Sequence, residues 1–355
     1  MRVSANLSAD KNIRIGKGES RYIAGMEDKM KIGFCVVNYS EKPVEEVVKL
    51  AAENGYDCVE LPAYEDNGQV DVKEMLKGNN AKKLKKMVED HGLFISSLSN
   101  HADSLLVMGP YSAGTDSICP GTREEKIKFG TESLIRSAQL ASELGVPAVV
   151  AFSGMENYGH INDWPEPNGW KYEEEQFALK YTPILDKYKE YGVKLAFEPH
   201  PNNIVYDTQS ALRCLEVVDH HPAFAINLDP ANILFSGINV QTFIDELKGR
   251  IALVHAKDCE FVQHNMAKGG LNMYMQDGWG RLDRSFRFRI PGWGDVDWKR
   301  LISELFITGY DYVLNYEHED VIMSRADGVK KTIEFFRPLM IDAPYEGRSD
   351  KLFTK

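Results

Sequence analysis

Four stretches decide the fold: KLAFEPH at residues 194–200, FAINLDP at 224–230, IALVHAKD at 251–258 and YVLNYEHE at 312–319. Each begins with a short apolar run typical of a buried strand and ends in residues that carry charge or bind metals. Longer segments with apolar residues at helical spacing lie between them. A strand followed by a helix, repeated along the chain, is typical of βα units around a parallel sheet.

The same alternation extends toward the N-terminus. It predicts four earlier strands at residues 31–38, 58–61, 94–101 and 148–154, and helices that include 123–144 and, at the end of the chain, 324–340. Eight such units close a barrel, whereas a doubly wound sheet would need a glycine-rich GxGxxG loop after the first strand, which this sequence lacks. We therefore predict a single (β/α)8 TIM barrel over residues 30–340. Residues 1–29 are expected to form an N-terminal extension and residues 341–355 a C-terminal tail.

Two predicted connections are too long to be simple turns. They cover residues 155–172 after the fourth strand and residues 259–296 after the seventh, and both are rich in aromatic residues. Because both leave the carboxyl ends of strands, they are expected to overhang the same mouth of the barrel as a lid or binding wall. The alternative is that they are disordered insertions.

Composition excludes several classes of protein. The net charge of −11 and the pI of about 5.4 disfavour a nucleic-acid partner. The five cysteines are scattered and have no CxxC spacing, which favours free thiols in a reducing compartment. No apolar run approaches the roughly 20 residues of a membrane span, and the N-terminus does not resemble a secretory signal. A cytoplasmic protein that binds no membrane is expected.

Glu198, Asp229, His255 and Glu317 each closely follow the apolar core of a strand. A carboxylate at such a place is costly unless it is paired or bound to a metal. Because the carboxyl ends of barrel strands meet at one mouth, the four side chains are expected to converge there. Three carboxylates and one imidazole would hold one divalent cation, with Mn²⁺ the first choice and Mg²⁺, Co²⁺ or Zn²⁺ as alternatives.

The runs FEPHP, NLDPAN, HAKD, PGWGDVDW and YEHED together resemble the sugar phosphate isomerase/epimerase family, the xylose isomerase-like TIM barrels, over residues 31–340. The resemblance implies that Glu198, Asp229, His255 and Glu317 bind one divalent metal. It also implies that the two glutamates, Glu198 and Glu317, move protons at carbons next to a carbonyl. The sequence departs from the epimerase pattern at Asn232, where those enzymes often have a histidine that can exchange protons.

Other polar residues near the predicted mouth are candidates for substrate contacts. These are His200, Asn232, Lys257, Arg289 and His101. His160, in the loop after the fourth strand, is a candidate catalytic acid, and the alternative is a solvated loop residue. The alternative for His200 is a histidine whose hydrogen bonds are satisfied by a neighbouring group. The alternative for Lys257 is an ion pair with Asp258. If Arg289 does not contact the substrate, Arg287 is the next candidate.

The sequence favours a metal-dependent isomerase or epimerase that removes a proton next to the carbonyl of a keto-sugar. The alternative is a lyase or dehydratase that expels a leaving group from an inosose or a 3-keto-glycoside. A nuclease of the apurinic-endonuclease type would need further metal ligands on the early strands, where the first two strands offer only Glu60. A non-catalytic sugar-binding subunit is the last alternative. The expected partner is a small keto-sugar or glycoside. The sequence does not decide whether the protein also forms a homo-oligomer or binds a partner subunit.

Overall fold

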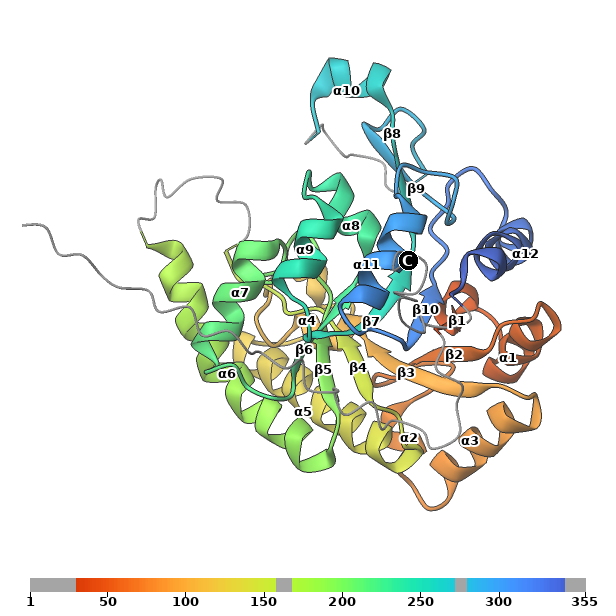
Figure 1. The fold of residues 1–355 in the computed structure, drawn as a ribbon. Coiled ribbons are helices and arrows are strands. Elements are labelled where there is room, and N and C mark those ends of the chain that lie inside the picture. Colours follow the sequence, from red (N-terminus) through yellow and green to blue (C-terminus); the bar gives the residue numbers. More distant parts are fainter. Residues whose placement is uncertain (1–29, 158–167, 272–279, 342–355) are drawn as a thin grey trace, which may run out of the picture.

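The computed structural model describes residues 30–157, 168–271 and 280–341, and it has the predicted closed barrel (Figure 1). Eight parallel strands follow one another around the barrel in the order β1-β10-β7-β6-β5-β4-β3-β2. Their bounds are β1 Lys31–Cys35, β2 Cys58–Pro62, β3 Phe94–Asn100, β4 Ala148–Ala151, β5 Lys194–Phe197, β6 Phe224–Leu228, β7 Ile251–Ala256 and β10 Val313–Tyr316.

Helices lie around the strands, as Figure 1 shows. Their bounds are α1 Val44–Glu53, α2 Val72–Met75, α3 Asn80–Asp90, α4 His101–Leu105, α5 Arg123–Leu144, α6 Gly169–Tyr191, α7 Thr208–Val217, α8 Pro230–Phe235, α9 Val240–Glu246, α10 Gln263–Gly269, α11 Trp298–Ile307 and α12 Arg325–Phe336. The predicted helix at 123–144 is confirmed as α5. Thr122 caps its first turn in a capping box with Glu125, and Gly145 ends it with a φ of 73°. Among the described residues, no helix combines the length and apolarity that a membrane crossing requires.

Most predicted strands are two or three residues too long at their carboxyl ends. After β1, residues Val36–Tyr39 form a 3₁₀ helix, and after β3 the chain enters α4 at His101. Polar side chains at these ends still make contacts across the barrel: Asn38 donates to the carbonyl oxygen of Tyr316 on β10 at 3.1 Å, and Nε2 of His101 lies 3.1 Å from Oε2 of Glu198. The predicted helix at 324–340 is α12, which Ser324 caps, and Pro338 lies in the separate 3₁₀ turn that follows it.

The prediction of a single long loop over residues 259–296 is wrong. The segment holds most of a two-stranded antiparallel sheet, β8 Asp258–Phe261 and β9 Phe286–Arg289. The sheet packs on α8, where the Phe235 and Phe286 rings stack with centroids 4.3 Å apart and Phe288 lies in the same apolar cluster. The alternation in FRFR puts both phenylalanines of β9 on one face, which is the periodicity of a strand. The other long connection is shorter than predicted, because α6 already begins at Gly169.

Candidate active site

The four residues predicted to bind a metal come together at the mouth of the barrel. Glu198 follows β5, Asp229 follows β6, His255 lies in β7 and Glu317 follows β10. These four strands are consecutive neighbours in the barrel, so their carboxyl ends deliver the four side chains to one place. One ligand atom from each lies within 4.8 Å of the ligand atoms of the other three. All are buried except Glu317, whose side chain is 15% exposed.

Two buried atoms of this quartet make no hydrogen bond. Nδ1 of His255 lies 3.1 Å from Oε2 of Glu198 and 3.5 Å from Oε2 of Glu317 without the alignment of a hydrogen bond. Oδ2 of Asp229 is the second such atom, although Nζ of Lys257 lies 2.8 Å away. A buried ring nitrogen without a hydrogen bond, as Nδ1 of His255 is here, is rare in folded proteins. A ring nitrogen and three carboxylates aimed at one point form a donor set that fits a divalent cation.

Neighbouring donors fix the carboxylate of Glu198. Its Oε1 accepts a hydrogen bond from Nδ2 of Asn232 at 2.9 Å, and its Oε2 accepts one from Nδ2 of Asn227 at 3.0 Å. Nε2 of His101 lies 3.1 Å from the same Oε2. The structure thus brings His101 and Asn232, both predicted to contact substrate, into direct contact with Glu198.

Lys257 lies at the centre of a second set of carboxylates. Its Nζ is 2.9 Å from Oε2 of Glu317 and 2.9 Å from Oε2 of Glu319, in addition to its contact with Asp229. The alternative prediction of an ion pair with Asp258 is wrong. The carboxylate of Asp258 instead accepts hydrogen bonds from the Trp298 indole and from backbone amides of residues 259, 292 and 296.

Burial and neighbouring charges shift the pKa values of this cluster. Burial, with Glu198 and Glu317 adding to it, raises the pKa of Asp229 to about 7 against the opposing effect of Lys257. For Glu198, burial acts in the same direction, but the charge of His255 outweighs it and holds the pKa well below its usual range. Burial would lower the pKa of Lys257, yet Asp229 and Glu317 outweigh burial and raise it. The charged forms of Glu198 and Lys257 are therefore stabilised, whereas the charged form of Asp229 is disfavoured.

His200 and Arg289 are engaged by protein groups. Nδ1 of His200 lies 2.7 Å from the carbonyl oxygen of Pro201, and burial lowers the pKa of His200, which favours the neutral ring. Arg289 donates through Nε to Asp320 at 2.9 Å and through a terminal nitrogen to Glu260 at 2.7 Å. This guanidinium therefore ties β9 to β8 and to the turn after β10. His160 falls outside the described residues, so its predicted role stays a prediction.

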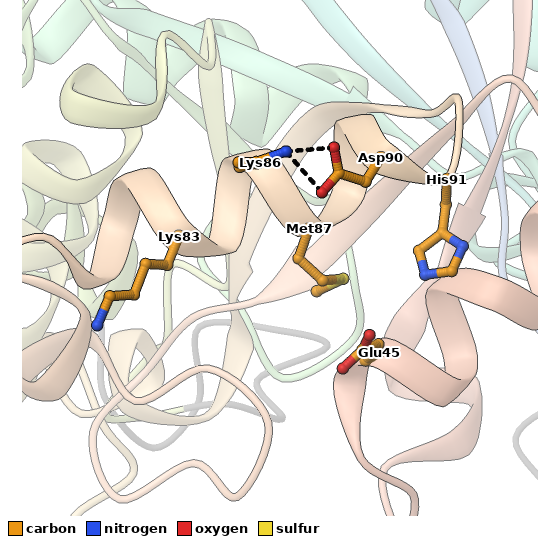
Figure 2. Close-up of a pocket in the computed structure, with 6 residues that line it drawn as sticks. All are labelled: Glu45, Lys83, Lys86, Met87, Asp90 and His91. Carbon is orange, nitrogen blue, oxygen red and sulfur yellow. Dashed lines mark hydrogen bonds and ion pairs between the residues drawn. The ribbon is translucent and has the colours of Figure 1, made fainter.

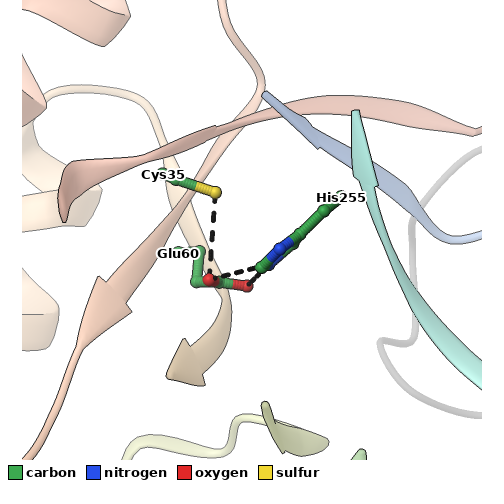
Figure 3. Close-up of side chains that lie close together, drawn as sticks. All are labelled: Cys35, Glu60 and His255. Carbon is green, nitrogen blue, oxygen red and sulfur yellow. Dashed lines mark hydrogen bonds and ion pairs between the residues drawn. The ribbon is translucent and has the colours of Figure 1, made fainter. Parts of the chain in front are cut away.

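Sequence reasoning gave Glu60 no part in this site. The structure places Glu60, in the middle of β2, in the interior of the barrel, where its carboxylate faces Nε2 of His255 at 3.1 Å and Sγ of Cys35 at 3.8 Å (Figure 3). A single charged residue inside the apolar strand CVELP was the signal that could have identified it.

A surface hollow between α1 and α3 contains none of the predicted site residues. Figure 2 shows the side chains that line it, which are Glu45, Lys83, Lys86, Met87, Asp90 and His91. They lie on helices at the outside of the barrel. This hollow therefore lies away from the barrel mouth, where the quartet converges.

Comparison with known proteins identifies the family. The sequence profile of the xylose isomerase-like TIM barrels matches residues 48–339. The chain belongs to this family. The uncharacterized protein YfiH of Bacillus subtilis is 24% identical over 324 residues, which cover 86% of this chain and 97% of YfiH.

Solved structures of the xylose isomerase-like fold superimpose on almost the whole barrel. The probable 3-DHS dehydratase AsbF of Bacillus anthracis has a TM-score of 0.61 at 18% identity, covering 86% of this chain and 98% of AsbF. The 3-keto-D-glucoside 4-epimerase YcjR of E. coli has a TM-score of 0.61 at 16% identity, covering 87% of this chain and 100% of YcjR. At these identities the likeness concerns the fold alone. The neighbours in this fold include both epimerases and dehydratases.

Proposed function

We propose that this protein is a divalent-metal-dependent isomerase or epimerase that removes a proton next to the carbonyl of a keto-sugar. The observation that carries the proposal is the convergence of Glu198, Asp229, His255 and Glu317, with Nδ1 of His255 and Oδ2 of Asp229 buried and without hydrogen bonds. The quartet would hold the ion, and Mn²⁺ is the cation we favour. A bound divalent ion would polarise the carbonyl of the substrate and so acidify the hydrogen on the adjacent carbon.

The two glutamates are suited to proton transfer because they come from different sides of the site. Glu198 follows β5 and Glu317 follows β10, and β6 and β7 lie between these strands. A substrate carbon between them would meet one carboxylate on each face. One glutamate would take the proton and the other would return it on the opposite face, which inverts the configuration. General acid–base help of this kind contributes about 10²- to 10⁴-fold to a rate.

Lys257 is suited to stabilise negative charge on the substrate. Its ammonium group lies within 3 Å of Glu317, at the edge of the quartet, and burial keeps water away from it. When the proton leaves the substrate, charge develops on the carbonyl oxygen, and a nearby fixed ammonium lowers the energy of that state. The neutral ring of His200, at the same mouth, is suited to hydrogen-bond a sugar hydroxyl.

A second candidate is a lyase that uses the same enolate to expel a leaving group. Asn232 favours it, because this residue is committed to Oε1 of Glu198 and supplies no exchangeable proton for a simple epimerisation. The likeness of the fold to a probable dehydratase is compatible with this chemistry. The substrate would then be an inosose or a 3-keto-glycoside.

The test is incubation of the Mn²⁺-loaded protein in D₂O with a panel of ketoses and 3-keto-glycosides, followed by NMR. Deuterium at a carbon beside the carbonyl, without a new fragment, is the result expected of an isomerase or epimerase. Release of water or of an aglycone would instead show that the protein is a lyase.

The variant Glu317→Gln keeps the shape of the side chain and loses its basicity, so we expect turnover to fall by at least 10²-fold. Glu53→Gln, at an exposed residue on α1, is the matched control and should leave turnover unchanged. Turnover of Glu317→Gln at the rate of the unmodified protein would refute the mechanism.

A further inference from the structure

Glu60 is a buried carboxylate for which the proposed reaction has no use. It comes from β2, three strands away from His255 on β7 in the order of the barrel, and it is 1% exposed. A buried charge without compensation is strongly destabilising. The neighbouring groups must therefore compensate the charge of Glu60.

Each oxygen of Glu60 has its own partners. Oε2 accepts hydrogen bonds from Oγ of Ser97 at 2.6 Å and from Nδ2 of Asn315 at 3.2 Å. Oε1 faces Nε2 of His255 at 3.1 Å, and Sγ of Cys35 lies 3.8 Å from it, as Figure 3 shows. Donors on β3 and β10 thus fix the carboxylate, and its remaining strong interaction is with the imidazole ring.

This contact decides which nitrogen of His255 carries the proton. A carboxylate that already accepts two hydrogen bonds can only accept another, so Nε2 must be the protonated nitrogen. When a cation replaces the proton on Nδ1, the ring keeps its Nε2 proton and offers the ion the lone pair on Nδ1. That atom is the one that lies 3.1 Å from Glu198 and 3.5 Å from Glu317 without a hydrogen bond.

We infer that Glu60 is a positioning residue that holds His255 as the Nε2-protonated tautomer and directs its Nδ1 lone pair at the cation site. The inference rests on the proposed function for the presence of a divalent cation at the quartet. Hydrogen bonds from a metal-binding histidine to a carboxylate orient the ring and raise its basicity, and their loss costs about 10- to 100-fold in metal affinity.

The same three side chains, Cys35, Glu60 and His255, also satisfy the distances of a metal cluster. We assign them a hydrogen-bonding role for two reasons. Oε2 of Glu60 is occupied by Ser97 and Asn315, and Oε1 faces Sγ of Cys35 and Nε2 of His255, so a cation at Oε1 would have to displace the protons of both groups. His255 would also have to bridge two cations through both ring nitrogens, which would leave the ring without its proton. One cation per chain is therefore expected.

The experiment measures Mn²⁺ binding to the full-length protein by EPR of the free ion. The unmodified protein should bind one Mn²⁺ per chain, and Glu60→Gln and Glu60→Ala should bind it about 10- to 100-fold more weakly. Glu65→Gln is the matched control, because Glu65 is equally buried but pairs with Arg136 and Lys73 away from the quartet. Its Mn²⁺ affinity should equal that of the unmodified protein.

The outcomes separate this inference from the proposed function. Unchanged affinity in Glu60→Gln, or two ions per chain, would overturn the role of Glu60 and leave the quartet standing. Absence of Mn²⁺ binding by the unmodified protein would overturn the metal centre itself. If the Glu60 variants do not fold, ¹⁵N-histidine NMR of the unmodified Zn²⁺-loaded protein tests the inference instead. The signals of His255 are those that disappear in His255→Gln. Zinc on Nδ1 and a proton on Nε2 are expected, and zinc on Nε2 would refute the inference.

Discussion

Lys257→Met should destabilise the metal-free protein strongly, because it removes the cation shared by three carboxylates. Nζ of Lys257 lies 2.8–2.9 Å from Asp229, Glu317 and Glu319, and the lysine side chain is 3% exposed. Methionine has a similar length and keeps the packing of the stem. The substitution therefore isolates the effect of the charge.

The magnitude follows from burial. Removal of one partner from a buried ion pair costs about 3–5 kcal/mol, since the remaining charge is left buried and unpaired. The side chain of Glu319 is 38% exposed, so solvent relieves part of the cost there. We expect a decrease of about 3 kcal/mol in the free energy of unfolding, at the lower end of that range.

Addition of Mn²⁺ should reduce this difference. Without the ammonium group, the carboxylates of Asp229 and Glu317 attract a divalent cation more strongly, and a tenfold gain in affinity would restore about 1.4 kcal/mol. The loss relative to the unmodified protein should thus shrink from about 3 to about 1.5 kcal/mol in saturating Mn²⁺. Metal would then partly replace the lysine.

The assay is urea-induced unfolding at neutral pH, in EDTA and in Mn²⁺. Lys248→Met is the matched control, because Lys248 pairs with Asp245 at the surface, where both side chains are more than 60% exposed. An exposed pair is worth at most about 1 kcal/mol. A loss for Lys257→Met in EDTA no larger than that of the control, or a loss that Mn²⁺ leaves unchanged, would refute the reasoning.

Three further predictions concern the barrel, the β8–β9 sheet and the metal. Gly33→Ala would place a Cβ atom 1.9 Å from Oδ1 of Asn315, so urea unfolding should show a loss of about 1–3 kcal/mol, and an unchanged midpoint would contradict the packing. Burial raises the pKa of Asp320, but bonds from backbone amides and from Arg289 outweigh it and lower the pKa. The stability that Asp320 contributes should therefore be present above about pH 4 and be lost as the pH falls through the folded-state value, so urea midpoints of the unmodified protein and Asp320→Asn should converge at low pH. A difference between the two urea midpoints that stays the same at every pH would contradict this role of Asp320. EDTA treatment should lower the unfolding free energy by about 2.7 kcal/mol relative to protein in Mn²⁺ at 100 times its Kd, and identical melting curves with and without chelator would argue against a bound ion.

Sequence periodicity was sufficient to predict the barrel and the quartet. Each βα unit has its own local pattern, and the parallel strands of a barrel present their carboxyl ends at one mouth. Glu198, Asp229, His255 and Glu317 could therefore be grouped although they are far apart in the chain. The helix at 123–144 was predictable to the residue because its cap and its terminal glycine are local signals.

The β8–β9 sheet and the role of Arg289 were not predictable in this way. The strand periodicity of FRFR covers only four residues, and the sheet depends on the apolar surface that α8 offers to Phe286 and Phe288. Arg289 was expected to contact substrate from its position in the RFRIPGWG segment. Its partner Glu260 comes from β8 and its partner Asp320 from the turn after β10, and both meet it only in the folded chain.

What the sequence by itself determined is the identity and common location of the quartet, because the alternation of strands and helices fixes which ends meet. What only the tertiary structure decided is how the quartet is supported. Asn227 and Asn315 stand two residues before Asp229 and Glu317, so the period of a strand already points them into the barrel. Their partners, Glu198 and Glu60, lie on other strands. Closure of the barrel sets these distances across the interior, and no local pattern in the chain records them.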